Sequence, residues 1–244
     1  MNRLVLIVLR NIIKLPVAYW KLCRYAKHPE RYSEAEKWKH IQYIMGLAAN
    51  SANVDLQIYG KENIPAENGF MLYGNHQGMF DVVAIAATCD APLAVVYKKE
   101  LRSVPLLKQI YACTNSFAMD REDVRQSLTV IQSVTKEVLS GRNYVIFPEG
   151  TRSKNGNQMG TFHGGSFRCA VKAKCPIVPM AFVDSYRVLD QKGTDYMTVQ
   201  LHYLKPIPYE EYKDLKTVEL AEVVKERIGA VIDACSKEGK ESGA

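Results

Sequence analysis

The sequence lacks the patterns that mark several large classes of protein. Its six cysteines in 244 residues include no C-x-x-C pair, so the spacing of a zinc site and the density of a disulfide scaffold are both missing. Neither a Walker A motif nor the G-x-G-x-x-G fingerprint of dinucleotide-binding proteins occurs, so nothing supports nucleotide binding. We therefore expect reduced thiols, as in the cytosol, no bound metal and no cofactor.

The first 20 residues also lack an uninterrupted apolar run. Their longest uncharged stretch is six residues, whereas a membrane-spanning helix needs about 18. A signal peptide fits poorly, because Arg10 and Lys14 fall where its apolar region should be. On one continuous helix, Arg3, Arg10, Lys14 and Lys21 would lie within about 40° of one another. This narrow basic stripe predicts a helix lying in a membrane interface. The alternative is a helix that packs on the domain with its lysines in water.

Positive charge is concentrated at the amino terminus. The formal net charge is +6, and the first fifty residues hold nine basic and three acidic side chains. The other 194 residues hold 23 of each sign, so we expect no nucleic-acid partner for the body. The balance instead predicts a basic appendage that meets an anionic surface. A second amphipathic segment at 33–49 would complete a helical hairpin over residues 1–50.

The rest of the chain, residues 51–244, has the pattern of an α/β domain. Short β-rich runs alternate with helical patterns such as 124–138 and 218–235, which favours a mostly parallel central sheet of about seven strands flanked by helices. The strands are expected at 54–59, 70–74, 93–97, 116–119, 144–147, 177–182 and 197–203. In such a sheet, ligands bind outside the carboxyl ends of the strands. The residues that follow each strand are therefore the candidates for a functional site.

The strand at 70–74 is followed by a histidine and an aspartate five residues apart, His76 and Asp81. They cannot pair on a continuous helix, but a turn at Gly78 would allow it. Asp81 would then hold the Nδ1–H of the imidazole and leave Nε2 free as a general base. Spacing alone leaves open a second interpretation, in which His76 is a buried structural histidine.

The strand at 144–147 is followed by Pro148-Glu149-Gly150-Thr151-Arg152-Ser153. Proline ends the strand, and glycine permits an unusual backbone angle. Arg152 offers a planar fork of donors that suits a phosphate group. An ordinary loop would explain the proline and the glycine but not the whole string.

Together these two blocks resemble the glycerolipid acyltransferase family. The closest resemblance is to 1-acylglycerol-3-phosphate acyltransferases, which convert lysophosphatidate to phosphatidate. Intermediate blocks follow in the family's order: residues 98–101 resemble its lysine-bearing segment, 116–121 its second block and 177–180 its fourth. The resemblance covers about residues 54–182.

The resemblance implies a role for each matching residue. His76 would deprotonate the acceptor hydroxyl, Asp81 would orient it, and the hydroxyl would attack the thioester of acyl-CoA or acyl-carrier protein without an acyl-enzyme. Backbone N–H groups at Gly150 and Thr151 would stabilise the oxyanion. The candidates for binding the acceptor phosphate are Arg152, Lys98, Lys99 and Arg121. Asn75 and Glu149 are expected as supporting residues, and Glu149 would orient Arg152 or shape the loop without transferring a proton. The family also implies a peripheral enzyme at the cytoplasmic face of a membrane, with lysophospholipid and anionic phospholipids as partners.

The chain departs from the family pattern at two positions. Asn115 stands where the second block usually opens with glycine, and asparagine tolerates left-handed backbone angles, so we expect the turn to be kept. His163 stands where the family often has lysine, which bears on the choice of acceptor or acyl carrier.

Three rival functions remain open. A serine hydrolase would use Ser166, but the G-x-S-x-G elbow is missing because Arg168 stands at its last position. A non-catalytic lipid-binding module would be expected to have lost the His76–Asp81 dyad or Arg152. Another acyltransferase would use glycerol 3-phosphate or a lysolipid without phosphate as its acceptor.

Overall fold

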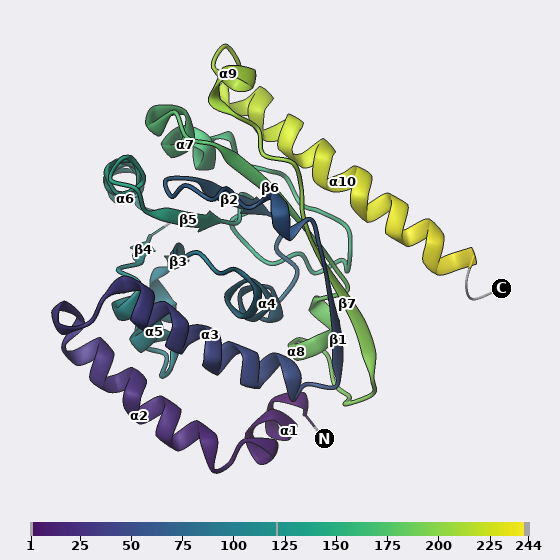
Figure 1. The fold of residues 1–244 in the computed structure, drawn as a ribbon. Coiled ribbons are helices and arrows are strands. Elements are labelled where there is room, and N and C mark those ends of the chain that lie inside the picture. Colours follow the sequence, from purple (N-terminus) through teal and green to yellow (C-terminus); the bar gives the residue numbers. More distant parts are fainter. Residues whose placement is uncertain (1, 121, 242–244) are drawn as a thin grey trace.

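The computed structural model describes residues 2–120 and 122–241 and contains a seven-stranded sheet at its centre (Figure 1). The strand order is β1-β7-β6-β2-β5-β3-β4, and every pair is parallel except β6 with β7. All seven predicted strands are confirmed, with ends that differ by no more than one residue. The strands are β1 (Val54–Tyr59), β2 (Met71–Gly74), β3 (Leu93–Lys98), β4 (Phe117–Met119), β5 (Asn143–Ile146), β6 (Ile177–Val183) and β7 (Met197–Tyr203).

Helices cover both faces of this sheet, as Figure 1 shows. The apolar core on one face includes side chains from α1 to α5, and the core on the other face includes α6, α7 and α10. The helices are α1 (Arg3–Arg10), α2 (Lys14–Lys27), α3 (Glu34–Asn50), α4 (Phe80–Thr88), α5 (Leu107–Cys113), α6 (Val124–Leu139), α7 (Arg168–Ala173), α8 (Tyr186–Leu189), α9 (Tyr209–Tyr212) and α10 (Thr217–Glu241). Short 3-10 turns occur at Pro29–Arg31, Lys61–Asn63, Lys99–Ser103 and Gly164–Phe167.

Strand β2 lies in the middle of the sheet and separates the two cores. Leu72 contributes to one core, whereas Met71 and Tyr73 contribute to the other, as the two-residue repeat of a strand requires. All four residues of β2 are buried. The segment that follows β2 is therefore anchored at the centre of the sheet.

The amino-terminal segment differs from the continuous helix expected from its sequence. The helix is interrupted between α1 and α2. There the Asn11 side chain donates to the carbonyl of Ile7 (2.9 Å) and to Oγ of Ser51 (2.7 Å). Arg3 is 1% exposed, so it cannot belong to a basic stripe in water or at a membrane. Arg10 stays exposed and donates to the carbonyl of Ser51 at 3.0 Å. The predicted stripe is wrong because the helix ends at Asn11 and because Arg3 is buried.

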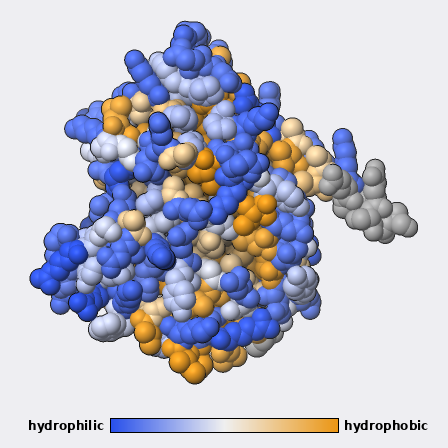
Figure 2. All heavy atoms as spheres, viewed as in Figure 1, coloured by the Kyte–Doolittle hydropathy of each residue, from blue (hydrophilic) through white to orange (hydrophobic). Residues whose placement is uncertain are grey.

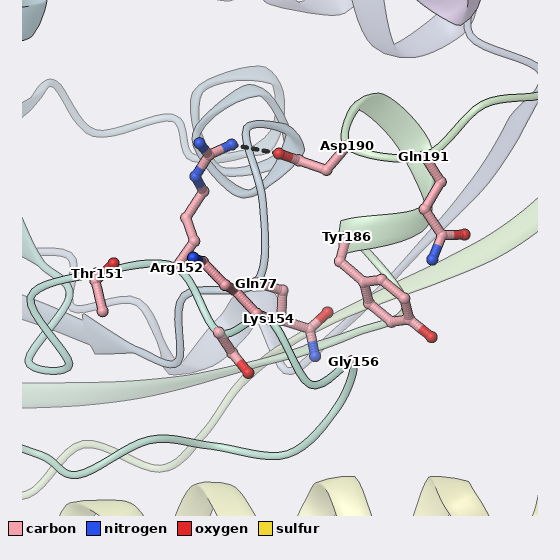
Figure 3. A pocket seen from close by; sticks show the side chains of 9 residues that line it. Gln77, Thr151, Arg152, Lys154, Gly156, Tyr186, Asp190 and Gln191 are labelled. Atoms are coloured by element: carbon pink, nitrogen blue, oxygen red, sulfur yellow. Dashed lines mark hydrogen bonds and ion pairs between the residues drawn. The ribbon is translucent and has the colours of Figure 1, made fainter.

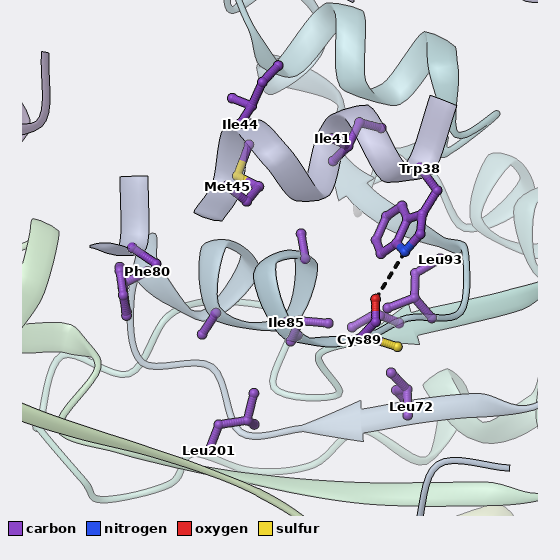
Figure 4. Close-up of a cluster of buried hydrophobic side chains, with 14 of the residues drawn as sticks. Trp38, Ile41, Ile44, Met45, Leu72, Phe80, Ile85, Cys89, Leu93 and Leu201 are labelled. Carbon is purple, nitrogen blue, oxygen red and sulfur yellow. Dashed lines mark hydrogen bonds between the residues drawn. The ribbon is translucent and has the colours of Figure 1, made fainter. Parts of the chain in front are cut away.

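Helix α3 packs directly on the body of the protein. Ser33 caps its first turn by accepting from the N–H of Glu36 at 3.1 Å. Trp38 of α3 reaches the end of α4, where its indole donates to the carbonyl of Cys89 at 3.0 Å (Figure 4). The buried face of α3 shares one apolar core with β2 and α4. Residue 50 therefore marks a change of secondary structure and not a break in the core.

The turn before β4 confirms the expectation for Asn115. Its φ is +47°, which lies in the left-handed region that glycine usually occupies. The substitution of asparagine for the family's glycine therefore keeps the turn.

Candidate active site

Three loops meet at one edge of the sheet. Residues 75–81 follow β2, residues 147–153 follow β5, and residues 184–190 follow β6. Because these three strands are adjacent and parallel, their carboxyl ends lie side by side. The sequence placed its two main candidate blocks at this edge, and the structure brings them together there.

The dyad predicted from the sequence forms. Nδ1 of His76 lies 2.7 Å from Oδ2 of Asp81, and the imidazole stacks on the ring of Phe147 with 4.1 Å between ring centroids. A carboxylate oxygen only accepts, so Nδ1 carries the hydrogen and Nε2 keeps its lone pair. The His76 side chain is 19% exposed, whereas that of Asp81 is fully buried. One nitrogen is thus anchored in the interior while the imidazole keeps an accessible edge, which suits a general base.

Asp81 is held by donors that the sequence did not reveal. Its Oδ2 also accepts from the backbone N–H groups of Gln77 (2.7 Å) and Gly78 (3.0 Å). Its Oδ1 accepts from the hydroxyl of Ser185, in the loop after β6. Ser185 lies 104 residues from Asp81, so no local pattern could have assigned it to the site.

Two neighbours of the dyad tie its loop to the sheet. The Asn75 side chain is 1% exposed and exchanges two hydrogen bonds with the backbone of Phe182, at 2.8 and 3.0 Å. The chain turns at Gly78 as expected, and Gly78 is not among the described glycines with a positive φ. A Cβ at Gly78 would lie 2.5 Å from Oδ2 of Asp190 and 3.1 Å from Cα of Tyr186. This glycine is therefore required by a close approach of the loop after β6.

Glu149 joins the two main blocks. Its Oε1 accepts from the N–H of His76 at 2.7 Å, and its Oε2 accepts from the N–H of Gly160 at 2.8 Å. The residue is 5% exposed. Both carboxylate oxygens are thus committed to backbone donors, and Glu149 fixes the position of the histidine's backbone.

We expect Glu149→Gln to lower the free energy of unfolding by about 1–3 kcal/mol. An amide has a single acceptor oxygen, so its NH₂ group would face one of the two backbone donors and leave it unpaired. Urea denaturation measures the change. Glu222→Gln is the matched control, because Glu222 is exposed on α10 and should change stability by no more than about 0.5 kcal/mol. Equal stability of the two variants would contradict this role for Glu149.

The loop after β5 offers one of the two predicted oxyanion donors. The N–H of Gly150 donates to the carbonyl of Phe147 at 3.0 Å, and the φ of Gly150 is +70°. Gly150 therefore forms a turn with its own N–H engaged. Within the described part of the chain, the N–H of Thr151 donates to no protein acceptor. Thr151 stays the candidate oxyanion donor.

Arg152 lines an open pocket of about 520 Å³ beside the dyad loop. Gln77 contributes to its wall, and Tyr186 and Asp190 contribute from the loop after β6 (Figure 3). The guanidinium of Arg152 forms an ion pair with Asp190, which the sequence did not predict. The pocket is large enough for a polar head group, and an arginine suited to phosphate is part of its wall.

The remaining predicted phosphate ligands lie elsewhere or outside the described residues. Lys98 pairs with Glu100 at 3.3 Å, and Lys99 pairs with Asp120 at 2.5 Å. Neither lysine is among the described residues that line the Arg152 pocket. Arg121 lies outside the described residues. Binding of phosphate by these three side chains stays a prediction.

Residues 2–120 and 122–241 contain no group of three or more histidine, cysteine, aspartate or glutamate side chains that could hold a metal ion.

Comparison with known proteins places the site in a family. The family model described as Acyltransferase matches residues 55–183, which include both blocks of the site. The chain is 26% identical over 208 residues to 1-acyl-sn-glycerol-3-phosphate acyltransferase alpha of Ovis aries, covering 84% of this chain and 69% of the sheep protein. It is 30% identical over 169 residues to 1-acyl-sn-glycerol-3-phosphate acyltransferase of Salmonella typhimurium, covering 68% of this chain and 69% of the bacterial protein.

A solved structure has the same fold. The crystal structure of the 1-acyl-sn-glycerophosphate acyltransferase PlsC from Thermotoga maritima matches 94% of this chain and 98% of its own, with a TM-score of 0.74 and 21% sequence identity. The α/β architecture and the helices before the first strand agree. Because the family model covers more than half of the chain and includes the loops after β2 and β5, this protein belongs to the acyltransferase family.

Proposed function

We propose that this acyltransferase moves a fatty acyl chain from acyl-CoA or acyl-carrier protein to the free hydroxyl of 1-acylglycerol 3-phosphate, which yields phosphatidate. One observation carries the proposal: the accessible imidazole of the His76–Asp81 pair lies at the same sheet edge as the pocket of Arg152. A base and a phosphate-binding group placed together suit an acceptor that has both a hydroxyl and a phosphate. The relatives' names specify the same acceptor.

In the proposed reaction, Nε2 of His76 takes the proton of the acceptor hydroxyl as its oxygen attacks the thioester carbonyl. A carbon–oxygen bond forms, and the carbon–sulfur bond breaks as the tetrahedral intermediate collapses. The imidazolium returns the proton to the departing thiolate, so the products are an ester and a thiol. Asp81 stabilises the imidazolium, and the N–H of Thr151 is the candidate donor to the oxyanion.

Four of the six cysteines are poorly suited to carry the acyl chain as an intermediate. Burial raises the pKa of the Cys113 and Cys169 thiols to about 11 and that of the Cys89 and Cys175 thiols to about 12. A thiol with so high a pKa is protonated near neutral pH and is a poor nucleophile.

An activity matrix on the purified protein tests the proposed function. Acceptors would be 1-acylglycerol 3-phosphate, glycerol 3-phosphate and 1-acylglycerol, each combined with acyl-CoA and with acyl-carrier protein. We expect the highest kcat/KM for 1-acylglycerol 3-phosphate. A preference for 1-acylglycerol would contradict the proposed acceptor, and donor hydrolysis without transfer would support the hydrolase instead.

The junction of α1 and α2 carries an exposed apolar surface that suits a lipid bilayer. Figure 2 shows apolar side chains at the lower edge of the molecule, where these helices lie in Figure 1. Its exposed members are Leu4, Val5, Val8, Leu9, Ile12, Ile13, Val17, Tyr19 and Trp20. Lys14 and Lys21 are also exposed beside them and can approach anionic head groups. Among the described helices, none is long and apolar enough to cross a membrane. We propose that this surface lies in the membrane interface.

We expect the double substitution Ile13→Asp with Val17→Asp to lower vesicle binding at least about 10-fold. Each side chain is more than half exposed, 82% and 68%, and burying a large apolar side chain contributes about 1.5–3 kcal/mol. Flotation with vesicles of phosphatidylglycerol and phosphatidylcholine measures the bound fraction. Val218→Asp is the matched control, because Val218 is 65% exposed on α10. Equal loss in the control, or no loss in the double variant, would argue against this surface.

A further inference from the structure

The carboxylate of Asp190 connects the two catalytic loops. Its Oδ2 accepts from the N–H of Met79 at 2.8 Å, and its Oδ1 accepts from the guanidinium of Arg152 (Figure 3). Gly78 leaves room for this contact, since a Cβ there would overlap Oδ2 of Asp190. Asp190 is thus seated against the turn that joins His76 to Asp81, while it holds the arginine of the neighbouring loop.

This contact restricts the Arg152 side chain relative to the dyad. The Arg152 side chain is 47% exposed, and a long flexible side chain without a partner loses rotamer entropy when it binds a ligand. The pair with Asp190 uses one Nη1 donor, which leaves Nε and Nη2 able to bind a phosphate. Because Asp190 is anchored on Met79, next to α4, the fork of Arg152 is held at a set distance from the dyad.

The loop that carries Asp190 is itself held by helix α1. Arg3 donates from Nη2 to the carbonyl of Asp195 at 2.6 Å and from Nη1 to the carbonyl of Val188 at 3.4 Å. Val188 and Asp195 flank Asp190 in the sequence. The guanidinium of Arg3 is buried, and an isolated β-bridge joins Asn2 to Gly193 in the same loop. The amino-terminal end of helix α1 therefore holds the 188–195 segment in place through these contacts.

We propose that Asp190 is a positioning residue for Arg152, and that Arg3 acts through Asp190 by holding the 188–195 segment. The phosphate subsite is thus assembled in part by the helix that carries the exposed apolar surface. This inference rests on the proposed function, because it deepens the role given to Arg152. It assigns Arg3 to the architecture of the acceptor site and not to contact with a membrane.

The test uses two water-soluble acceptors, so that membrane docking plays no part. 1-Hexanoylglycerol 3-phosphate and 1-hexanoylglycerol are compared below their micellar concentrations, and the ratio of their kcat/KM values measures selectivity for phosphate. Asp190→Asn should lower this ratio about 10-fold, mainly through KM of the phosphate acceptor, because a charge-assisted contact to the arginine is lost. Arg3→Met should lower it in the same direction by a smaller factor.

Matched controls separate this effect from general loss of charge. Asp90→Asn removes a surface carboxylate that pairs with Lys61 at 2.8 Å, and Arg10→Ala removes an α1 arginine that bonds to Ser51 and Asn53 instead. Both should leave the ratio unchanged. If Arg3→Met does not fold, Arg3→Lys, which keeps the charge and loses the fork, is measured in its place and should give an intermediate loss.

Several outcomes would overturn the proposal. An unchanged ratio in Asp190→Asn, while the wild type prefers the phosphate acceptor, refutes the role of Asp190 and leaves the proposed function intact. A higher ratio would mean that Asp190 competes with phosphate and does not position Arg152. Equal losses with both acceptors would indicate a merely structural role. A wild type without phosphate preference would refute the proposed function itself.

Discussion

Replacing His76 by alanine is expected to lower the rate of acyl transfer by about 10²–10⁴, the contribution of a positioned general base. The fold should persist, because the lost side-chain hydrogen bond is the one to Asp81. Asp81 keeps its donors from Gln77, Gly78 and Ser185 after the substitution. Initial rates with 1-acylglycerol 3-phosphate and acyl-CoA measure the effect, and circular dichroism verifies the fold.

His28→Ala is the matched control for this substitution. His28 is 37% exposed, lies between α2 and α3, and approaches Glu30 at 3.9 Å. It should retain the wild-type rate. Transfer by His76→Ala at the wild-type rate would rule out the dyad as the catalytic base and favour the interpretation of His76 as a structural histidine.

Replacing Arg152 by alanine is expected to raise KM for 1-acylglycerol 3-phosphate by about 10- to 100-fold. Hydrogen bonds to charged groups contribute about 1.5–3 kcal/mol, and each 1.4 kcal/mol corresponds to a factor of ten. KM for the acyl donor should stay nearly constant, because the pocket of Arg152 is assigned to the acceptor. Steady-state kinetics with each substrate varied in turn separate the two values.

Arg227→Ala is the control for this arginine. Arg227 is 38% exposed and pairs with Glu211 at 3.3 Å, so it matches Arg152 as an exposed arginine with a carboxylate partner. It should change neither KM. If Arg152→Ala altered only the KM of the acyl donor, the assignment of this pocket to the acceptor phosphate would have to be abandoned.

The sheet could be read from the sequence because its strands are locally determined. Most of the strands are rich in β-branched and aromatic residues and are bounded by polar or turn residues, and the unbroken apolar run at the start of β2 is typical of a strand buried on both faces. The dyad could be predicted for a related reason. His76 and Asp81 are five residues apart at the end of a central strand, so one turn was enough to bring them together.

The rest of the site depends on contacts between distant segments. Ser185 and Asp190 come from the loop after β6, over one hundred residues from the groups near β2 that they bind. Neither residue has a local signal, since a serine or an aspartate after a strand is common. Glu149 was singled out by its motif, but its function as an acceptor of two backbone N–H groups required the folded chain.

The error at the amino terminus has the same cause. A helical wheel places Arg3 and Arg10 on one face with Lys14 and Lys21 only if the helix continues, and Asn11 ends it with help from Ser51, forty residues away. Arg3 is buried against the carbonyls of Val188 and Asp195, whereas Arg10 stays exposed. The exposed apolar residues of α1 and α2 then form the outer surface. The membrane-interface role of this segment stays a prediction.

The central claim, acyl transfer to the hydroxyl of 1-acylglycerol 3-phosphate by the His76–Asp81 pair, is tested most directly by measuring both products together. Purified wild type and His76→Ala are each given acyl-CoA and 1-acylglycerol 3-phosphate, and phosphatidate and free CoA are quantified by mass spectrometry. We predict that the wild type forms the two in equal amounts and that the variant forms both at a rate about 10²–10⁴ lower. Release of CoA without phosphatidate, or equal phosphatidate formation by both proteins, would contradict the account.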